Sequence, residues 1–321
     1  MERAHTPRRQ TDIDVKESFA THYKELLQDK YETFMECNHH YLRRALRINT
    51  LKADPERIAD QLTRAGWQLT PVPWCAHAYW ISGERRDIGN LLEHQLGHVY
   101  IQDPASMLPP IVLNPKPGET ILDMCASPGS KTSQAAAMME NTGVIVANDV
   151  EAKRLAPLQT NLQRLGVINA VITKKDGRAF KNQQFDRIMI DAPCSGTGTL
   201  RRSLKGIDMF NIKQVHNLSR LQKDLLAAGW QALKPGGVIT YSTCTLEPLE
   251  NEVVVSEFLA SHPQATLSDI TLDIKREDAW TAHPETGKAL HSEVRKCLRI
   301  HPYTNDTEGF FVCRIHKPKS L

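Results

Sequence analysis

The sequence lacks the features that mark a membrane protein, a secreted protein or a zinc protein. No run approaches the roughly 18 apolar residues that a membrane-spanning helix needs. The first nine residues contain no apolar core of the kind that a signal peptide carries. The seven cysteines form no Cys-x-x-Cys pair, so neither a disulfide framework nor a zinc site is indicated. These absences predict a protein of the reducing cytoplasm, without a bound metal.

Two common nucleotide-binding signatures are also missing. The chain has no Gly-x-Gly-x-x-Gly segment, which argues against a dinucleotide cofactor such as NAD. It has no good phosphate-binding loop either, because Ser130 separates Gly129 from Lys131 and the upstream glycine is absent. The net charge is only +3, so any basic surface for a nucleic acid must be local.

The first 100 residues predict a helix followed by a small α+β module. Apolar residues recur at helical spacing over residues 15–35, which predicts one amphipathic helix. A second helix is expected to begin at Asp54-Pro55, which supplies an N-cap and a proline at the first helical position, and to end at Gly66. Strands are expected at residues 43–51, 67–69 and 78–81.

The small module is rich in basic residues. They are Arg43, Arg44, Arg47, Lys52, Arg57 and Arg64. Such a set is either a solvated basic face or a surface that contacts phosphates. The second interpretation is favoured only if the chemistry of the chain acts on nucleic acid.

From residue 120 onward the pattern changes to a regular alternation of strands and helices. Strands are expected at 120–124, 143–148, 170–173, 186–190 and 237–242, and helices at 130–139, 151–165, 213–233 and 249–260. Continuous apolar strands separated by amphipathic helices predict a parallel, doubly wound α/β sheet. Residues 296–301 and 309–316 are expected to form an antiparallel hairpin at its edge.

Acidic residues at the ends of these strands predict a ligand site. The turn Asp123-Met-Cys-Ala-Ser-Pro-Gly-Ser-Lys-Thr132 leads into a helix, whose first amides suit an anionic or polar group. Asp149 lies about 20 residues beyond Gly129, where a carboxylate binds ribose hydroxyls in related folds. Asp176-Gly177 follows the next strand and could border an adenine. Each acid alone could be a helix N-cap, but together they indicate an adenosine ligand without phosphates, such as S-adenosylmethionine.

Two cysteines and an aspartate lie at or just after the ends of two predicted strands. Asp191-Ala-Pro-Cys194 follows one strand, and Tyr-Ser-Thr-Cys244 ends another. Carbon 5 of a pyrimidine accepts a methyl group only after a thiolate has added to carbon 6. A second group must then help to release the product, while an acid stabilises the charge on the ring. Cys194, Cys244 and Asp191 could supply this set, although strand-end cysteines can also be small apolar residues at the rim of a core. We favour the core interpretation for the thiols of Cys37, Cys75, Cys125, Cys297 and Cys313.

The chain resembles the RNA cytosine-5 methyltransferases of the Nop/Sun type. The resemblance rests on the turn at 123–132, Asp176-Gly177, Asp191-Ala-Pro-Cys-Ser-Gly196, Tyr241-Ser-Thr-Cys-Thr245 and the closing segment at 305–312. It implies a Rossmann-like S-adenosylmethionine-dependent methyltransferase sheet with helices on both faces and an antiparallel C-terminal hairpin. The catalytic domain would occupy residues 101–321, and residues 1–100 would form the N-terminal helix and a small α+β RNA-binding module.

The resemblance also implies roles for single residues. Cys244 would be the nucleophile, Cys194 would assist release of the product, and Asp191 would face both the cofactor and the cytosine. The cofactor contacts would be Cys125, Ala126, Ser127, Pro128, Gly129, Lys131, Asp149, Arg154, Asp176, Gly177 and Asp191. Ser127 departs from the alanine that many members carry, but a small residue is retained.

The expected substrate is an unpaired or flipped-out cytidine, because this mechanism cannot reach a base inside a duplex. Basic residues at 199–205, and Lys174, Lys175, Arg178 and Lys181, are either solvated or contact the RNA backbone. We expect a monomer that acts on tRNA, as the segment Gly-Thr-Gly-Thr-Leu-Arg-Arg202 resembles tRNA-acting members. Ribosomal RNA is the alternative, and DNA methylation or a non-catalytic RNA-binding factor are further rivals.

Overall fold

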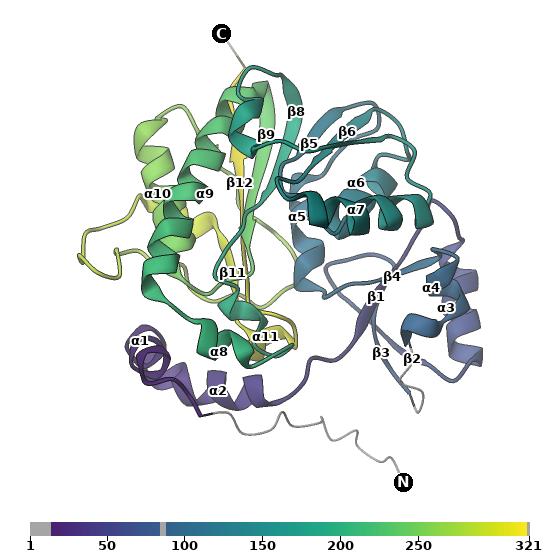
Figure 1. Cartoon of the computed structure of the whole chain (residues 1–321), viewed down its shortest axis with the longest axis horizontal. Helices are drawn as coiled ribbons and strands as arrows, with labels where there is room; N and C mark the ends of the chain where they lie inside the picture. Colours follow the sequence, from purple (N-terminus) through teal and green to yellow (C-terminus); the bar gives the residue numbers. More distant parts are fainter. Residues whose placement is uncertain (1–13, 84–87, 320–321) are drawn as a thin grey trace.

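The computed structural model describes residues 14–83 and 88–319 and contains a large sheet and a small one (Figure 1). Within the described residues the large sheet has eight strands. Its order is β10 (Thr266–Leu267), β12 (Phe310–His316), β9 (Leu233–Thr243), β8 (Phe185–Asp191), β5 (Thr120–Asp123), β6 (Val144–Asn148) and β7 (Ala170–Thr173), with β11 (Leu298–Ile300) paired to β12. The strands from β9 to β7 are parallel, and β12 runs antiparallel to β9.

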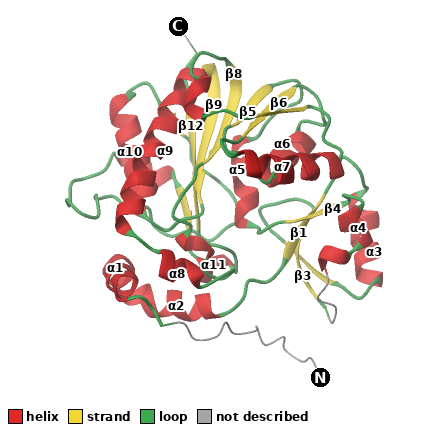
Figure 2. Ribbon diagram, viewed as in Figure 1, coloured by secondary structure: helices red, strands yellow, loops and turns green. Residues whose placement is uncertain are grey.

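Helices cover both faces of the large sheet (Figure 2). One face packs on α9 (Ile212–Ala232) and α10 (Glu252–Ser261), and the other packs on α5 (Leu108–Leu113), α6 (Ser130–Met138) and α7 (Ala152–Arg164). Strand β8 shows why both faces are apolar, since Ile188 and Ile190 face α9 whereas Met189 faces α5 and α6. The predicted doubly wound α/β fold is therefore confirmed.

The predicted antiparallel C-terminal hairpin at the edge of the sheet is confirmed, with β12 as its inner strand and β11 outermost. Strand β12 pairs with β11 and β10 on one side and with β9 on the other, so it lies inside the sheet. Phe311, Val312 and Ile315 are fully buried, as expected of a strand with helices or chain on both faces. The connection between β11 and β12 contains the short helix α11 (Pro302–Asn305).

The predicted N-terminal helix is broken into two. Helix α1 (Glu17–Leu27) and helix α2 (Tyr31–His39) flank a 3₁₀ turn at Gln28–Lys30, where Gln28 has a φ of 50°. The break lets Phe19 and Phe34 enter one core together with Ile207 of α8 (Lys205–Met209). Helical spacing alone did not reveal the break, because both apolar stripes satisfy the same periodicity.

The small sheet is entirely antiparallel, with the order β2 (Gln68–Pro71), β3 (Ala78–Ser82), β1 (Ala45–Ile48) and β4 (Val99–Ile101). Helices α3 (Pro55–Arg64) and α4 (Leu92–Gln95) accompany it. The predicted start of α3 is confirmed, as the carboxylate of Asp54 accepts a hydrogen bond of 2.8 Å from the backbone N–H of Arg57. Ile58 and Leu62 of α3 pack into the core of this module.

Two of the basic residues of the module join it to the large domain. Arg47 is buried and donates to Ser133 Oγ at 3.1 Å, and Lys52 donates to the carbonyls of Leu96 and Arg164. Arg47 is therefore used inside the protein, and for it the interpretation as a phosphate-contacting surface is wrong; Lys52 is exposed, and for it that interpretation stays a prediction. Arg57 and Arg64 remain exposed. No helix among the described residues is both long and apolar enough to span a membrane.

Candidate active site

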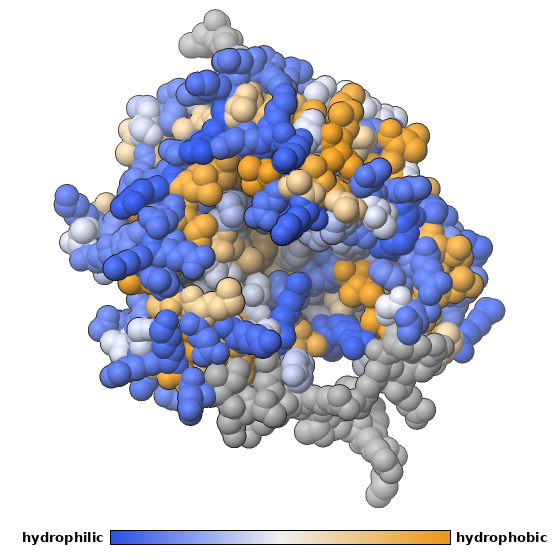
Figure 3. Space-filling model, in the orientation of Figure 1, coloured by the Kyte–Doolittle hydropathy of each residue, from blue (hydrophilic) through white to orange (hydrophobic). Residues whose placement is uncertain are grey.

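A cavity of about 390 Å³ lies at the carboxyl ends of β5 and β8. Its size falls within the roughly 300–1,000 Å³ that is usual for small-molecule sites. It is also lined by Tyr100 of the small module and by Phe310 of β12, so both parts of the chain enclose it. The space-filling view is hollowed between the large and small sheets (Figure 3). Ligands bind at this edge of open parallel sheets, as the sequence predicted.

The two strand-end cysteines meet at this edge. Sγ of Cys194 lies 3.3 Å from Sγ of Cys244. Their loops are joined because Gly198 N–H donates to the carbonyl of Cys244 at 3.0 Å and the N–H of Gly309 donates to the carbonyl of Gly198 at 2.9 Å. A Cβ atom on Gly198 would lie 2.3 Å from Gly309 O and 2.7 Å from Cys244 O. Only glycine permits this approach, which brings the two thiols together.

The environment separates the two thiols chemically. The hydrogen bond from Cys194, followed by the positive charges of Lys131 and Arg202, lowers the pKa of Cys244 against the opposing effect of burial. The same hydrogen bond, together with burial, raises the pKa of Cys194 well above its usual range. Of the two thiols, Cys244 is therefore the one whose deprotonation the surroundings favour, and the thiolate is the nucleophilic form of cysteine.

Asp191 and Lys131 form an ion pair beside the thiols. Oδ2 of Asp191 lies 2.8 Å from Nζ of Lys131, and its Oδ1 accepts a hydrogen bond of 2.8 Å from Ser242 Oγ. Lys131 also donates to Ser106 Oγ at 3.0 Å. Burial opposes the charge of Lys131, but Asp191 outweighs burial and raises the pKa of this lysine. The pair therefore presents a fixed ammonium and a fixed carboxylate to whatever occupies the cavity.

The turn after β5 is tied to the residues that follow β6. Ser127 N–H donates to Asp149 Oδ2 at 3.3 Å, and Arg154 lies 3.5 Å from the same oxygen. Arg154 also donates to the carbonyl of Ser127 at 2.9 Å. This network brings Asp149 next to a turn that lines the cavity, as the sequence predicted for a ribose-binding carboxylate.

Asp123 is the clearest sign that the cavity accepts a polar ligand. Its Oδ2 accepts a hydrogen bond of 2.6 Å from Thr132, while its buried Oδ1 has no partner among the described residues. Burial raises the pKa of Asp123 to about 7. A buried oxygen without a partner costs free energy unless a ligand or water bonds to it. The volume, the carboxylates and this open oxygen fit an adenosine-based cofactor.

The structure brings most of the predicted site residues to the cavity, but not all of them. Those that line it are Cys125, Ala126, Ser127, Pro128, Lys131, Arg154, Asp191 and Cys244. Gly129, Asp149, Asp176, Gly177 and Cys194 are outside this lining set. Asp176 bonds to Arg178, and a Cβ on Gly177 would lie 2.7 Å from Met124, so this glycine is needed for packing. Contact of Asp176 and Gly177 with a cofactor stays a prediction.

Cavity-lining residues that sequence reasoning did not assign come from distant segments. Asp103 and Glu308 are both buried, and the N–H of Glu308 donates to Asp103 Oδ1 at 3.3 Å. Burial raises the pKa of Asp103 to about 6 and raises that of Glu308 well above its usual range. Arg202 pairs with Glu308. Glu308 belongs to the closing segment that carried the family resemblance, but nothing local in the sequence connects it to Asp103.

The remaining predicted features are largely structural. Cys75, Cys297 and Cys313 are buried in apolar cores. Arg201 of the predicted basic cluster is buried and donates to the carbonyl of His40 at 3.1 Å. Among residues 14–83 and 88–319, no group of three His, Cys, Asp or Glu side chains could hold a metal ion.

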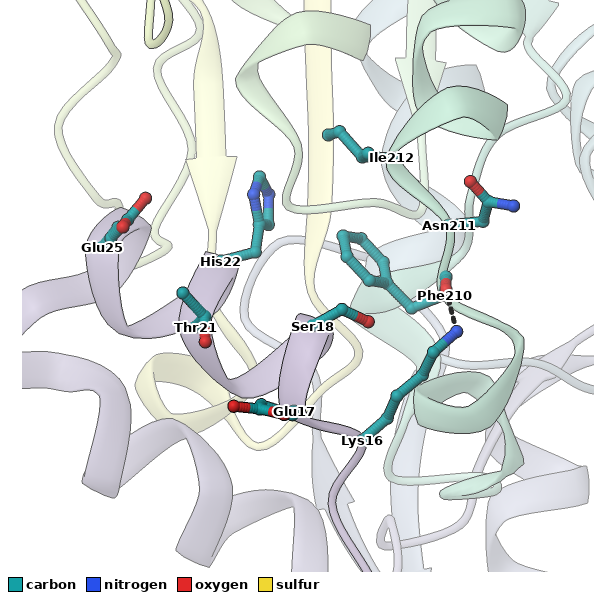
Figure 4. Close-up of a pocket in the computed structure, with 9 residues that line it drawn as sticks. All are labelled: Lys16, Glu17, Ser18, Thr21, His22, Glu25, Phe210, Asn211 and Ile212. Carbon is teal, nitrogen blue, oxygen red and sulfur yellow. Dashed lines mark hydrogen bonds between the residues drawn. The ribbon is translucent and has the colours of Figure 1, made fainter.

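A further cavity, of about 650 Å³, lies between α1 and the start of α9, away from the sheet edge (Figure 4). It is lined by Lys16, Glu17, Ser18, Thr21, His22, Glu25, Phe210, Asn211 and Ile212. Lys16 crosses its rim to donate to the carbonyl of Phe210 at 2.9 Å. None of the predicted catalytic residues lines it.

The doubly wound sheet, with a ligand cavity at the carboxyl ends of its strands, is the Rossmann-like sheet of a methyltransferase, as the matching family and structures show. The chain belongs to the RsmB/F family of RNA cytosine-5 methyltransferases. The family described as "16S rRNA methyltransferase RsmB/F" matches residues 110–316, and the "N-terminal domain of 16S rRNA methyltransferase RsmF" matches residues 15–104. The resemblance stated from the motifs is thereby confirmed.

Relatives with different substrates match the chain. The tRNA (cytosine(49)-C(5))-methyltransferase of Pyrococcus abyssi is 42% identical, covering 96% of this chain and 100% of that protein. Ribosomal RNA small subunit methyltransferase F of Shewanella frigidimarina is 39% identical and covers 87% of this chain, which spans 57% of that relative.

Solved structures show the same fold. A methyltransferase homolog protein from Pyrococcus horikoshii has a TM-score of 0.81 and 36% identity, covering 94% of this chain and 95% of that chain. NSun6 from Pyrococcus horikoshii with SFG has a TM-score of 0.79, covering 95% of this chain and 99% of that chain; at 23% identity it supports the fold alone.

Proposed function

We propose that this protein methylates carbon 5 of a cytidine in tRNA and takes the methyl group from S-adenosylmethionine. The observation that carries the proposal is the pair of thiols 3.3 Å apart, next to the ion pair of Lys131 and Asp191. Two thiols of opposite pKa shift suit a reaction in which one cysteine attacks the base and the other assists release.

In this mechanism Cys244 forms a bond from its thiolate sulfur to carbon 6 of the cytosine. Lys131 offsets the negative charge that develops on the ring as the thiolate adds, and the Asp191 carboxylate accepts a hydrogen bond from the exocyclic amine. After carbon 5 has gained its methyl group, the carbon-5 proton passes to solvent water through Cys194. The bond between Cys244 and carbon 6 then breaks, which restores the aromatic ring and the Cys244 thiolate.

The cofactor would be held by the turn Cys125–Lys131, with Asp149 and Arg154 at the ribose end and Asp176-Gly177 beyond it. When bound, S-adenosylmethionine supplies a methyl group on a positively charged sulfur. The carboxylate of Asp123, with its open oxygen, offers a further acceptor in this part of the cavity. The free thiols and an RNA substrate fit the cytoplasmic location that the sequence predicts.

Transfer RNA is the preferred substrate because the Pyrococcus abyssi relative, named for a tRNA cytosine, is 42% identical to this chain. Ribosomal RNA is the second candidate, since the matching family is described by 16S rRNA and several relatives of 37–41% identity carry that activity in their names.

Labelled S-adenosylmethionine should be incubated with purified tRNA, 16S rRNA or DNA, and the products digested to nucleosides. We expect label in 5-methylcytidine from tRNA; label from rRNA alone would overturn the substrate, and no label in 5-methylcytidine would overturn the activity.

The roles of the two cysteines need a separate test. Cys194→Ala should accumulate a covalent adduct between protein and RNA, because attack is retained and release is blocked. Cys244→Ala should form no adduct and no product. Denaturing gels with labelled RNA distinguish the two variants, and an adduct in Cys244→Ala would show that the assignment is reversed.

A further inference from the structure

Two buried side chains hold both peptide groups that flank Cys194. Gln222 of α9 donates from Nε2 to the carbonyl of Pro193 at 2.8 Å. Glu250, at the end of the 3₁₀ helix Pro248–Glu250, accepts from the N–H of Ser195 at 3.0 Å. The same carboxylate accepts from Nε2 of Gln222 at 2.8 Å, so the two side chains are joined. Neither side chain belongs to the proposed cofactor set, and neither lines the cavity.

Burial of the polar side chains of Gln222 and Glu250 costs free energy. Gln222 and Glu250 are both 0% exposed. Burial raises the pKa of Glu250 to about 7, against the opposing hydrogen bonds from Ser195 and Gln222. Well-packed apolar residues often replace a buried charged pair as a whole without loss of stability. Packing alone therefore does not require a carboxylate at this position.

The position of Glu250 connects the two cysteine segments. It lies on the segment that follows Cys244, while its acceptor oxygen holds the residue after Cys194. A second tie runs parallel, as Ser195 Oγ lies 2.7 Å from Thr245 Oγ1, which joins the residues directly after each cysteine. Cys244 itself directly follows β9, whose pairing with β8 and β12 does not involve these side chains. The hydrogen bonds of Gln222, Glu250 and Ser195 thus determine where Cys194 lies relative to Cys244.

We propose that Glu250 and Gln222 are positioning residues for Cys194, and that they govern release of the methylated RNA rather than formation of the covalent adduct. The inference rests on the proposed function of the two cysteines. With Glu250 and Gln222 in place, both peptide groups around Cys194 are fixed from one side, and its thiol stays against Cys244. Without them, Cys194 moves, while Cys244 keeps its place at the end of β9 and the ion pair of Lys131 and Asp191 beside it.

Glu250→Gln is the sharpest test. Ser195 N–H and Gln222 Nε2 both donate to Oε2 of Glu250, and Oε1 lies 3.4 Å from the nitrogen of Ser195. In Glu250→Gln the accepting oxygen loses its charge and an NH2 group replaces Oε1, so both hydrogen bonds weaken. We expect product release to slow roughly tenfold or more, because small misplacements of a reacting group cost on that scale. Adduct formation in a single turnover should slow less than release, because Cys244 loses only the hydrogen bond from Cys194. The matched control is Glu257→Gln, which makes the same change at an exposed site on α10 whose carboxylate pairs with Lys223.

The measurement is the ratio of covalent adduct to free 5-methylcytidine-containing RNA, normalised to folded protein. The expected result is a raised ratio in Glu250→Gln, as in Cys194→Ala, and an unchanged ratio in Glu257→Gln. Gln222→Met provides a second variant that keeps the carboxylate but removes the bond to Pro193, and it should shift the ratio in the same direction. An unchanged ratio in both variants, or an equal loss of adduct and product, would overturn the positioning role. No adduct in Cys194→Ala and no product in the wild type would instead reject the proposed function.

Discussion

At the scale of single residues, Lys131 contributes to the reactivity of Cys244. It pairs with Asp191 at 2.8 Å, and after the hydrogen bond from Cys194 its charge and that of Arg202 lower the pKa of Cys244. A thiolate held near a cation is reactive at neutral pH, whereas the deeply buried Cys125 has a pKa raised by burial and then by the charges of Asp123 and Asp191. The hydrogen bond from Cys194 and the two cations thus favour deprotonation of Cys244, while Cys125 in the same cavity is kept protonated.

Lys131→Met should raise the pKa of Cys244, because the variant removes a positive charge and leaves Asp191 unpaired. We expect iodoacetamide to alkylate Cys244 roughly tenfold more slowly near neutral pH, since one opposite charge commonly shifts a pKa by about one unit or more. Peptide mass spectrometry across a pH series measures the change. Lys153→Met, at an exposed position of α7, is the control and should leave the alkylation profile in place. A profile that moves toward lower pH in Lys131→Met would contradict the prediction.

Gly198→Ala tests the close approach that joins the two cysteine loops. The added Cβ would lie 2.3 Å and 2.7 Å from two backbone carbonyl oxygens, which cannot rotate away. We expect a loss of roughly 1–3 kcal/mol in the free energy of unfolding, as is typical of overpacking, and slower turnover. Urea unfolding compares it with Gly89→Ala, where the added Cβ has nothing within 4 Å. Equal stability of Gly198→Ala and Gly89→Ala would show that the two cysteine loops can move apart without loss of stability.

At the scale of elements, helix α1 is fixed to the segment that follows Cys244. Tyr23 donates to Oε1 of Glu247 at 2.6 Å, and the ring of His22 lies 3.0 Å from Oε2 of the same carboxylate. Glu247 is 0% exposed, and the hydrogen bonds from these two side chains of α1 offset the free-energy cost of burying its carboxylate. An N-terminal helix that has no catalytic group therefore supports the segment after the proposed nucleophile.

Tyr23→Phe removes a hydrogen bond to a buried carboxylate while it keeps the aromatic packing against Phe19. Hydrogen bonds to charged groups contribute about 1.5–3 kcal/mol, and we expect a loss of that size in the free energy of unfolding. Urea unfolding followed by circular dichroism gives the value. Tyr41→Phe, whose side chain is 45% exposed, should change stability little. If both variants lose the same amount, the bond to Glu247 is not the cause.

His22 should make the docking of α1 depend on pH. Burial opposes protonation, but the hydrogen bond and charge of Glu247 outweigh it and raise the pKa of His22 above 6.5. Besides Glu247, the groups that face His22 are Tyr23, Phe210, Glu25 and Glu285. A raised folded-state pKa gives stability that is complete below the unfolded pKa and is lost as pH rises through the folded pKa. The difference in unfolding free energy between wild type and His22→Gln should therefore be larger near pH 6 than near pH 9, and a difference that grows toward alkaline pH would contradict this.

At the scale of the whole molecule, the small module is held rigidly against the large domain. Asn49 donates to the carbonyls of Gly97 and Leu165, at 2.9 Å and 2.8 Å. Gly97 has a φ of 75°, and a Cβ there would lie 2.0 Å from Arg164 O at the end of α7. This junction determines where Tyr100 and Asp103 enter the cavity, so the orientation of the module is part of the active site.

Gly97→Ala should force the small module away from α7. We expect a larger loss of stability than in Gly66→Ala, which has a similar left-handed backbone, with a φ of 89°, but nothing within 4 Å of the added Cβ. The backbone cost of about 1–2 kcal/mol is common to both variants, so the excess in Gly97→Ala reports the clash. Hydrogen exchange should rise at residues 97–101 and 164–166, and methyl transfer to RNA should fall. Equal hydrogen exchange and equal stability in Gly97→Ala and Gly66→Ala would show that the contact between Gly97 and Arg164 can adjust to the added Cβ.

The sequence by itself determined the alternation of strands and helices, the α/β class and the strand-end positions of Asp191, Cys194 and Cys244, because hydrophobic periodicity and turn residues act over short stretches of chain. Only the tertiary structure decided the break at Gln28, the interior position of β12 and the use of Arg47 inside the protein. It also decided the 3.3 Å between the thiols, the meeting of Asp103 with Glu308, and the hold of Gln222 and Glu250 on the Cys194 loop. These features join residues far apart in the chain, and the register and packing that bring them together leave no local pattern.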